Sequence, residues 1–146
     1  KQKSVEMYTD LLDYIEKLQN KNINLLFDRT FFTEEVYCRL GFKEYTYTDA
    51  FEKFLKRLSN FDFKIFYITL YLSKEEEFEA RLNRADKGVT KYAKFSIESS
   101  IKQQNTYLDV AKEIKEKYSD KINVINIDTC IGLEKVKETI IDILQK

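Results

Sequence analysis

The chain of 146 residues is predicted to fold as a three-layer α/β domain, with helices on both faces of a parallel sheet. Short apolar segments alternate along it with longer segments whose apolar residues recur at helical spacing. Hydrophobic residues make up 43% of the chain and aromatic residues 14%, which suits one buried core. No linker, repeat or low-complexity segment divides the sequence, so residues 1–146 are expected to form a single domain.

The first part of the chain is predicted to contain three helices and one strand. The first helix covers residues 4–19, where apolar residues recur every three or four positions. Residues 23–27 are short, apolar and flanked by polar residues, which is typical of a buried strand. Thr33 is expected to cap a short helix, and Thr48 or Asp49 to cap the helix after it.

The middle of the chain is predicted to contain a second strand and a helix. Residues 64–72 are rich in Ile, Tyr and Phe, which favour a buried strand. Ser73 is expected to cap a helix that runs to about Arg84, with three glutamates in a first turn where the helix dipole favours them. Residues 85–94 are polar and contain a glycine, so they are expected to form a loop.

The last part of the chain completes the alternation of helices and strands. A long helix is expected over residues 95–118, a third strand over 122–127 and a closing helix over 133–144, with a loop over 128–132. Strands that alternate with helices imply parallel pairing.

The composition removes several classes of function. The chain has no histidine, which excludes histidine-based triads and histidine-ligated zinc, and we assign no metal ligands. Its 25 basic residues balance 25 acidic residues, so there is no electrostatic case for a nucleic acid polymer or a membrane as partner. Two distant cysteines are typical of a reduced protein in the cytoplasm.

Polar or charged residues follow all three predicted strands, the second of which ends near Leu72-Ser73. Asp28 and Arg29 come directly after the first strand, and Asp128 and Thr129 come after the last. Ligands of open parallel sheets bind beyond the carboxyl ends of the strands. Arg29 offers a rigid fork for a phosphate, and Asp28 could orient it, accept a hydroxyl proton or contact a magnesium shell. The alternative is a strand-end salt bridge that faces water.

Arg81 and Arg84 form a second candidate site, because three residues of spacing put both on one helix face. They open a predicted lid over about residues 81–94, which could close over a transferring phosphoryl group. In the alternative interpretation, they are a solvated helix end that pairs with Glu77 and the helix dipole.

Aromatic residues gather after Asp28 and Arg29, and the segment includes Phe32 and Tyr37. Some of them could stack on a nucleobase, although most members of such a cluster usually belong to the core. The loop that starts at Asp128 could likewise pack against a purine or simply connect a strand to a helix.

Together these segments resemble the second half of the thymidylate-kinase and deoxynucleoside-kinase group of P-loop kinases. The run D-R-T-F-F-T-E-E-V-Y that starts at Asp28 resembles the segment after that family's third strand. Residues 66–72 resemble its fourth strand, and Arg81-x-x-Arg84 with the following polar loop resembles its lid. The segments from Ile97 onward resemble its last helix, last strand and base-side loop.

The resemblance implies a kinase that uses ATP and Mg²⁺ and phosphorylates a nucleoside or a nucleoside monophosphate. Arg29 would contact this acceptor, with Asp28 as its acidic partner and with Phe32 and Tyr37 as further substrate-binding residues. Many members of the family dimerise through helices, so a homodimer is a further expectation.

On the donor side, the resemblance implies that Arg81 and Arg84 contact the donor and the transferring phosphates. Asp128 and Thr129 would lie beside the donor nucleotide. The chain departs from the family's lid pattern here, since Ala85-Asp86-Lys87 replaces a denser arrangement of arginines.

The sequence contains neither the first strand of that family nor its glycine-rich P-loop, because its three glycines lie far apart. In the family's sheet, this strand lies between those that match residues 23–27 and 66–72. Without it both neighbours would expose unpaired backbone groups and apolar faces, so we expect a further N-terminal segment. The alternative hypothesis is a non-catalytic, kinase-like binding or interaction module.

Overall fold

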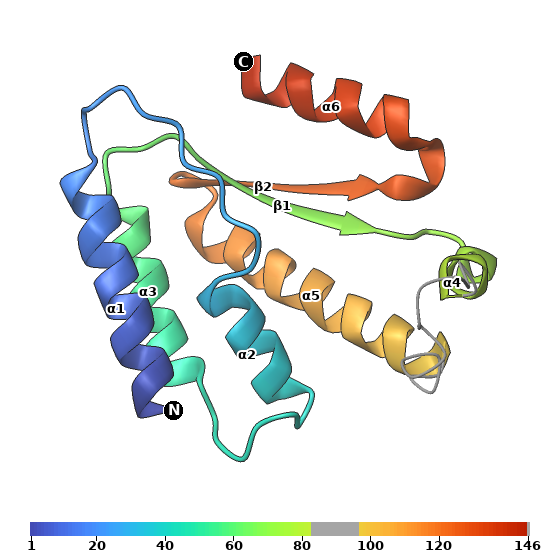
Figure 1. Ribbon diagram of the computed structural model, residues 1–146, viewed down its shortest axis with the longest axis horizontal. Coiled ribbons are helices and arrows are strands. Elements are labelled where there is room, and N and C mark those ends of the chain that lie inside the picture. Colours follow the sequence, from blue (N-terminus) through green and yellow to red (C-terminus); the bar gives the residue numbers. More distant parts are fainter. Residues whose placement is uncertain (83–96, 146) are drawn as a thin grey trace. The chain divides into compact units, whose positions relative to one another are not determined.

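A computed structural model describes residues 1–82 and 97–145 of the protein. In these residues it has six α-helices, one short 3-10 helix and two β-strands (Figure 1). None of the described helices is long and apolar enough to cross a membrane. The elements in chain order are α1 (Gln2–Lys17), α2 (Phe31–Arg39), α3 (Thr48–Ser59), β1 (Ile65–Tyr71), α4 (Glu75–Leu82), α5 (Ile97–Tyr118), β2 (Ile122–Asp128), η2 (Thr129–Ile131) and α6 (Leu133–Gln145).

The sheet of the described residues consists of β1 and β2, which are hydrogen-bonded neighbours. The two strands run in the same direction in Figure 1, with α4 and α5 between them in the chain. Both agree within one residue with the strands expected over residues 64–72 and 122–127. The mixed α/β class and the parallel pairing are therefore confirmed.

The strand expected over residues 23–27 is wrong, because these residues lie in an irregular segment between α1 and α2. Leu26 is 97% exposed, Phe27 45% and Ile23 41%. A strand is stabilised by hydrogen bonds to a neighbouring strand, and β1 and β2 pair only with each other in the described sheet. The apolar composition of residues 23–27 favours a strand, but no strand of the described sheet pairs with this segment.

The described chain divides into two compact units by its contacts. Unit 1 comprises Lys1–Tyr67 with Asp109–Val124, and unit 2 comprises Ile68–Leu108 with Ile125–Lys146. The expectation of a single domain stays a prediction.

Unit 1 holds most of the buried apolar side chains. Helices α1 and α3 pack side by side, and α2 also contacts α3 (Figure 1). The segments of unit 1 contribute the following residues to its core: Leu12, Ile15, Phe31, Val36, Tyr47, Ala50, Phe51, Phe54, Leu55, Phe61, Val110, Ala111, Ile114 and Ile122.

Unit 2 has a smaller core, in which Phe78 of α4, Ile127 of β2 and Val136 of α6 are buried. Helix α6 also contacts η2, the turn that precedes it. Gly132 joins η2 to α6 with φ +98° and ψ 150°, a conformation that is available essentially only to glycine.

The helix caps differ from those expected from the sequence. Helix α2 begins at Phe31 with Thr30 as its N-cap, so the predicted cap at Thr33 is wrong. Helix α3 has Tyr47 as its N-cap, because the Thr48 hydroxyl donates to the carboxylate of Glu35 instead. Helix α4 begins at Glu75, and the hydroxyl of Ser73, its predicted cap, donates to Asp128.

Candidate functional site

The strongest candidate site lies in unit 2, at the carboxyl ends of β1 and β2. Three predicted site residues meet there, together with Ser73, which the sequence predicts as a helix cap, and Gln104, which the sequence did not single out. We call this group the strand-end cluster, and it consists of Ser73, Arg81, Gln104, Asp128 and Thr129.

Thr129 connects the ends of the two strands. It follows β2 directly, and its Oγ1 donates to the backbone oxygen of Tyr71, the last residue of β1, at 3.0 Å. Arg81 of α4 donates from Nη1 to the same Oγ1 at 3.2 Å and from Nη2 to the backbone oxygen of Thr129 at 3.1 Å. The guanidinium group is thereby held where both strands end.

Asp128 accepts hydrogen bonds from both sides of this end. Its Oδ1 accepts from the backbone nitrogen of Cys130 at 2.9 Å and so caps η2. The Ser73 hydroxyl donates to Oδ2 at 2.5 Å, and the Ser73 backbone nitrogen donates to Oδ1 at 3.3 Å. The bond from the Ser73 hydroxyl, and after it the Cys130 N–H, lower the pKa of Asp128 from 3.8 to about 2. The carboxylate is therefore ionised at neutral pH.

Arg81 has donor capacity that no other described residue uses. Its Nε is buried and has no hydrogen-bond partner among the described residues. The nearest carboxylate is Glu77 one turn earlier on α4, whose Oε2 lies 3.9 Å from Nε. An unsatisfied buried donor on a cation is a group that an anionic ligand can satisfy.

Arg84, the other arginine of the predicted lid, lies outside the described residues. The same holds for the rest of the predicted lid beyond residue 82. The roles of Arg84 and of the lid stay predictions.

Asp28 and Arg29 belong to unit 1, in the irregular segment that precedes α2. Both are exposed, and neither makes a hydrogen bond or an ion pair to another described residue. Arg29 has φ +68°, a left-handed conformation that is uncommon and costly for a residue with a side chain. The strand-end salt bridge considered from the sequence does not form between them.

Phe32 and Tyr37 are both engaged in ring contacts within unit 1. The Phe32 ring stacks on Phe31 and on Tyr67, with both pairs of ring centroids 4.4 Å apart. Tyr37 contacts Phe42 at 5.5 Å between centroids. Both side chains are only partly buried and lie outside the buried core. The substrate-binding role of the two residues stays a prediction.

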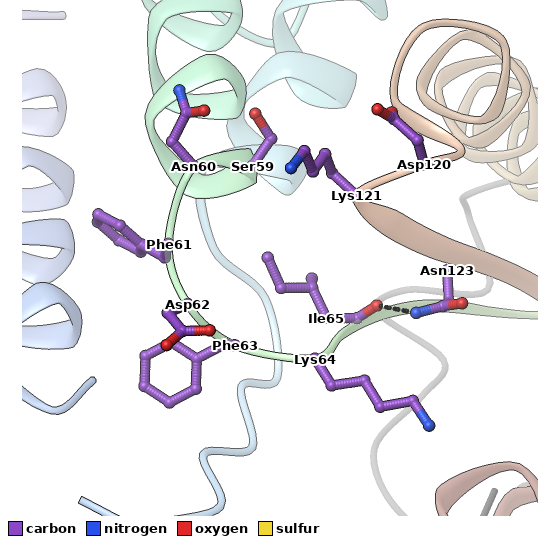
Figure 2. A pocket seen from close by; sticks show the side chains of 10 residues that line it. All are labelled: Ser59, Asn60, Phe61, Asp62, Phe63, Lys64, Ile65, Asp120, Lys121 and Asn123. Carbon is purple, nitrogen blue, oxygen red and sulfur yellow. Dashed lines mark hydrogen bonds between the residues drawn. The ribbon is translucent and has the colours of Figure 1, made fainter. Parts of the chain in front are cut away.

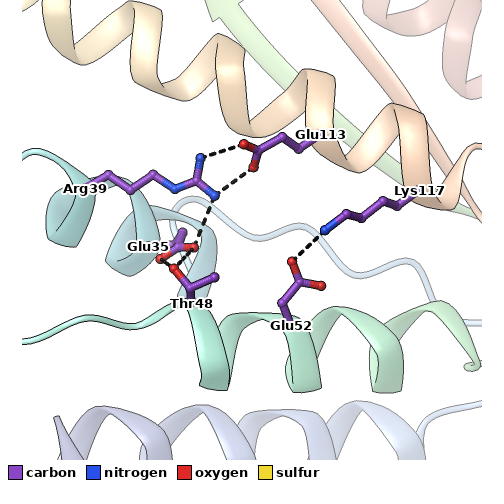
Figure 3. Close-up of polar contacts among 6 residues, drawn as sticks. All are labelled: Glu35, Arg39, Thr48, Glu52, Glu113 and Lys117. Atoms are coloured by element: carbon purple, nitrogen blue, oxygen red, sulfur yellow. Dashed lines mark hydrogen bonds and ion pairs between the residues drawn. The ribbon is translucent and has the colours of Figure 1, made fainter.

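A polar cluster around Glu35 in unit 1 was not anticipated from the sequence (Figure 3). The Glu35 side chain is only 1% exposed, and it accepts from Thr48 Oγ1 at 3.0 Å and from Arg39 Nη2 at 3.3 Å. Arg39 also binds Glu113 of α5 through both terminal nitrogens, at 3.1 and 2.7 Å, and this bidentate bond lowers the pKa of Glu113. The cluster ties α2, α3 and α5 together, so we assign it a structural role.

The spacing of Glu35 and Arg39 is the feature that could have revealed this cluster, since residues four apart on a helix are neighbours. No comparable pattern pointed to Gln104. Its partner is the backbone of Leu72, and sequence alone does not show which backbone groups need a partner.

A hollow of about 430 Å³ lies in unit 1, at the opposite ends of the strands, where β1 and β2 begin (Figure 2). Figure 2 shows the Lys121 side chain reaching toward Ser59, and Asn123 donates to the backbone oxygen of Ile65 at 2.9 Å. Two lysines and two aspartates balance in its lining, so its charge selects no class of ligand. The lining residues are Ser59, Asn60, Phe61, Asp62, Phe63, Lys64, Ile65, Asp120, Lys121 and Asn123.

Comparisons with known proteins assign no role to any of these residues. No protein-family model matches the chain, and no curated protein or solved structure matches it either. Within the described residues, no group of three or more His, Cys, Asp or Glu side chains is arranged to hold a metal ion.

Proposed function

We propose that the protein is an ATP-dependent phosphotransferase that acts on a nucleoside or a nucleoside monophosphate. The observation that carries the proposal is the position of Arg81 at the carboxyl ends of two parallel strands, with a buried Nε that lacks a hydrogen-bond partner among the described residues. This edge of a parallel sheet is where ligands bind, and an arginine there suits a phosphate.

The conformation of Arg29 supports the acceptor side of the proposal. Left-handed backbone at a non-glycine residue costs free energy, and such strain often accompanies a binding role. The guanidinium group of Arg29 is exposed and makes no ion pair to a described residue, so it is free to bind an acceptor phosphate or hydroxyl.

The chemistry fits a chain without histidine, because phosphoryl transfer depends mainly on positioning and charge neutralisation. ATP would supply the phosphoryl group, and Mg²⁺ would bind together with ATP. With a nucleoside as acceptor, a bond forms from its hydroxyl oxygen to the γ-phosphorus while the bond to the ADP oxygen breaks. The hydroxyl proton passes to the Asp28 carboxylate, which is exposed and has no hydrogen bond to a described residue.

Different described residues would bind the donor and the acceptor. Arg81 would hold donor phosphates through its Nε, which has no partner among the described residues, while it keeps its bonds to Thr129. Arg29 would hold the acceptor. Asp128 receives three hydrogen bonds that hold the strand end, and we propose that Asp128 and Thr129 lie beside the donor nucleotide. The proposal also requires a G-x-x-x-x-G-K-[ST] segment, which the 146 residues do not contain.

The test is a phosphoryl-transfer assay on the full natural chain, with ATP, Mg²⁺ and a panel of nucleosides and nucleoside monophosphates. Arg29→Ala is expected to lower kcat/KM for the acceptor by about 10- to 100-fold, because it removes a charge-assisted bond. Lys53→Ala is the matched control, since Lys53 is an exposed cation on α3 of the same unit. Equal acceptor kinetics for Arg29→Ala and the control would refute the assignment.

A non-catalytic binding module is the second candidate. It is favoured by the exposed apolar side chains of Ile23, Leu26 and Phe27, which a partner protein could cover. Calorimetric titration of the folded protein with ATP and with nucleotides separates the two candidates. Heat with ATP supports the kinase, whereas its absence supports the binding module.

A further inference from the structure

Gln104 of α5 acts on the end of β1 as a neighbouring strand would. The backbone nitrogen of Leu72 donates to Gln104 Oε1 at 2.8 Å, and Gln104 Nε2 donates to the backbone oxygen of Leu72 at 3.0 Å. Leu72 is the first residue after β1, where strand pairing stops. One side-chain amide therefore satisfies both backbone polar groups of this residue.

The residues on either side of Leu72 are held in the same manner by other side chains. Tyr71 accepts from Thr129, and Ser73 donates twice to Asp128. Three consecutive residues are thus fixed by three different side chains, and α4 begins two residues later at Glu75. Gln104 supplies the only contact of the three that comes from α5, since the other two come from the end of β2.

We infer that Gln104 is a positioning residue for the donor phosphates at Arg81, an inference that rests on the proposed function. Gln104 fixes Leu72, and this also fixes the adjacent carbonyl of Tyr71, to which Thr129 is bonded. Thr129 in turn receives Arg81. The amide of Gln104 thereby sets where α4 starts and where its guanidinium group meets a phosphate, although it touches neither.

The expected size of the effect follows from how strongly catalysis and binding depend on the position of the charged group. A shift of about 1 Å in a group that binds the reacting partner can cost about 100-fold in rate. Losing the Gln104 amide leaves two backbone groups of Leu72 without these partners, and the turn to α4 then loses this link to α5. We therefore expect weaker binding of ATP, with less effect on the acceptor.

Gln104→Glu tests the inference, because a purely structural role would not make the ATP affinity of this variant depend on the protonation of the glutamate. An ionised glutamate can still accept from the Leu72 N–H but cannot donate to its carbonyl oxygen. A protonated glutamate can donate again, so lowering the pH restores the missing bond. Gln104→Leu removes both bonds at every pH. Gln103→Glu is the matched control, since it adds the same charge at the neighbouring position, where the side chain makes no hydrogen bond to a described residue.

The experiment measures the Kd of ATP with Mg²⁺ by calorimetry for the full natural chain and these variants, between pH 8 and pH 5. Amide hydrogen exchange of Leu72 is followed in the same samples without nucleotide. At pH 8, Gln104→Glu and Gln104→Leu are expected to weaken ATP binding at least about tenfold relative to wild type. At pH 5, part of the glutamate is protonated, so the loss of ATP affinity relative to wild type is expected to be smaller for Gln104→Glu than at pH 8. For Gln104→Leu the loss is expected to be the same at both pH values.

The outcomes separate this inference from the proposed function. If wild type binds ATP but Gln104→Glu and Gln104→Leu bind it equally well despite faster exchange at Leu72, Gln104 is only structural and the inference is overturned. A folded Gln104→Glu variant whose ATP affinity relative to wild type is the same at pH 5 as at pH 8 also overturns it. If wild type binds no ATP at all, the proposed function fails and this inference fails with it.

Discussion

Asp128 performs two structural tasks with one carboxylate, since it caps η2 through Cys130 and holds Ser73 after the end of β1. At the sequence level, an aspartate after a strand also fits a ligand contact. The three hydrogen bonds it accepts establish the structural role, while its contact with a donor nucleotide stays a prediction.

The lowered pKa of Asp128 predicts how the stability of the fold depends on pH. The folded-state pKa of about 2 lies below the ordinary value of 3.8, so the stabilising contribution is complete above about pH 4. It is lost as pH falls from about 4 through about 2. In urea unfolding, Asp128→Asn should be less stable than wild type at pH 6, and the difference should shrink towards pH 2.

Ser73→Ala is the companion variant, because the Ser73 hydroxyl is the largest cause of the lowered pKa. The free energy of unfolding of Ser73→Ala should fall less between pH 4 and pH 2 than that of wild type. A difference between wild type and Asp128→Asn that stays constant from pH 6 to pH 2 would contradict the account of this carboxylate.

Glu35 shows how burial changes the meaning of a residue. A glutamate in the first turns of a helix is ordinarily solvated, and Glu35 resembles its neighbour Glu34 in the sequence. In the structure its side chain is nearly inaccessible and is satisfied by Thr48 and Arg39. A buried carboxylate needs such partners, and here they explain why Thr48 does not cap α3.

At the scale of elements, helices and strands with a partner followed their local pattern. Helix α3 has its apolar stripe on one face, and Phe51, Phe54 and Leu55 are all buried there. The strands β1 and β2 pair with each other. The segment over residues 23–27 has an equally apolar pattern but no neighbouring strand, so it remains irregular and exposed.

The exposure of Leu26 gives a direct test of this segment. Because the side chain is 97% exposed, Leu26→Ala should change the free energy of unfolding by less than about 0.5 kcal/mol. The same substitution at Leu12, which is 0% exposed, should cost about 2–5 kcal/mol. Chemical denaturation of both variants measures this. A cost above about 2 kcal/mol at Leu26 would show that the segment is buried after all, as in the predicted strand.

At the scale of the whole molecule, the two compact units share three regular elements. The boundaries fall within β1, α5 and β2, after Tyr67, Leu108 and Val124, and not in linkers. Domain boundaries normally lie in flexible, exposed connections with few contacts. Because each unit contains part of every shared element, neither unit is complete unless these elements are formed.

We therefore expect the protein to unfold in one cooperative transition. In a urea titration followed by amide NMR, Ile114 of unit 1 and Val136 of unit 2 should share one midpoint, because both depend on the shared elements. Both residues are buried and report on the cores of their units. Two separate midpoints would show that the units are independent domains.

The sequence by itself determined the α/β class, the positions of β1 and β2 and the helical segments, because hydrophobic periodicity is a local property of the chain. It also indicated that Asp128 and Thr129 follow a strand, whereas it placed Arg81 on a helix that opens a lid. Only the tertiary structure decided that residues 23–27 form no strand, that Phe32 packs in an aromatic cluster, and that Gln104 and Glu35 have polar partners distant in sequence. The physical reason is that pairing, burial and hydrogen bonding depend on which distant groups meet, and a single segment does not specify its neighbours.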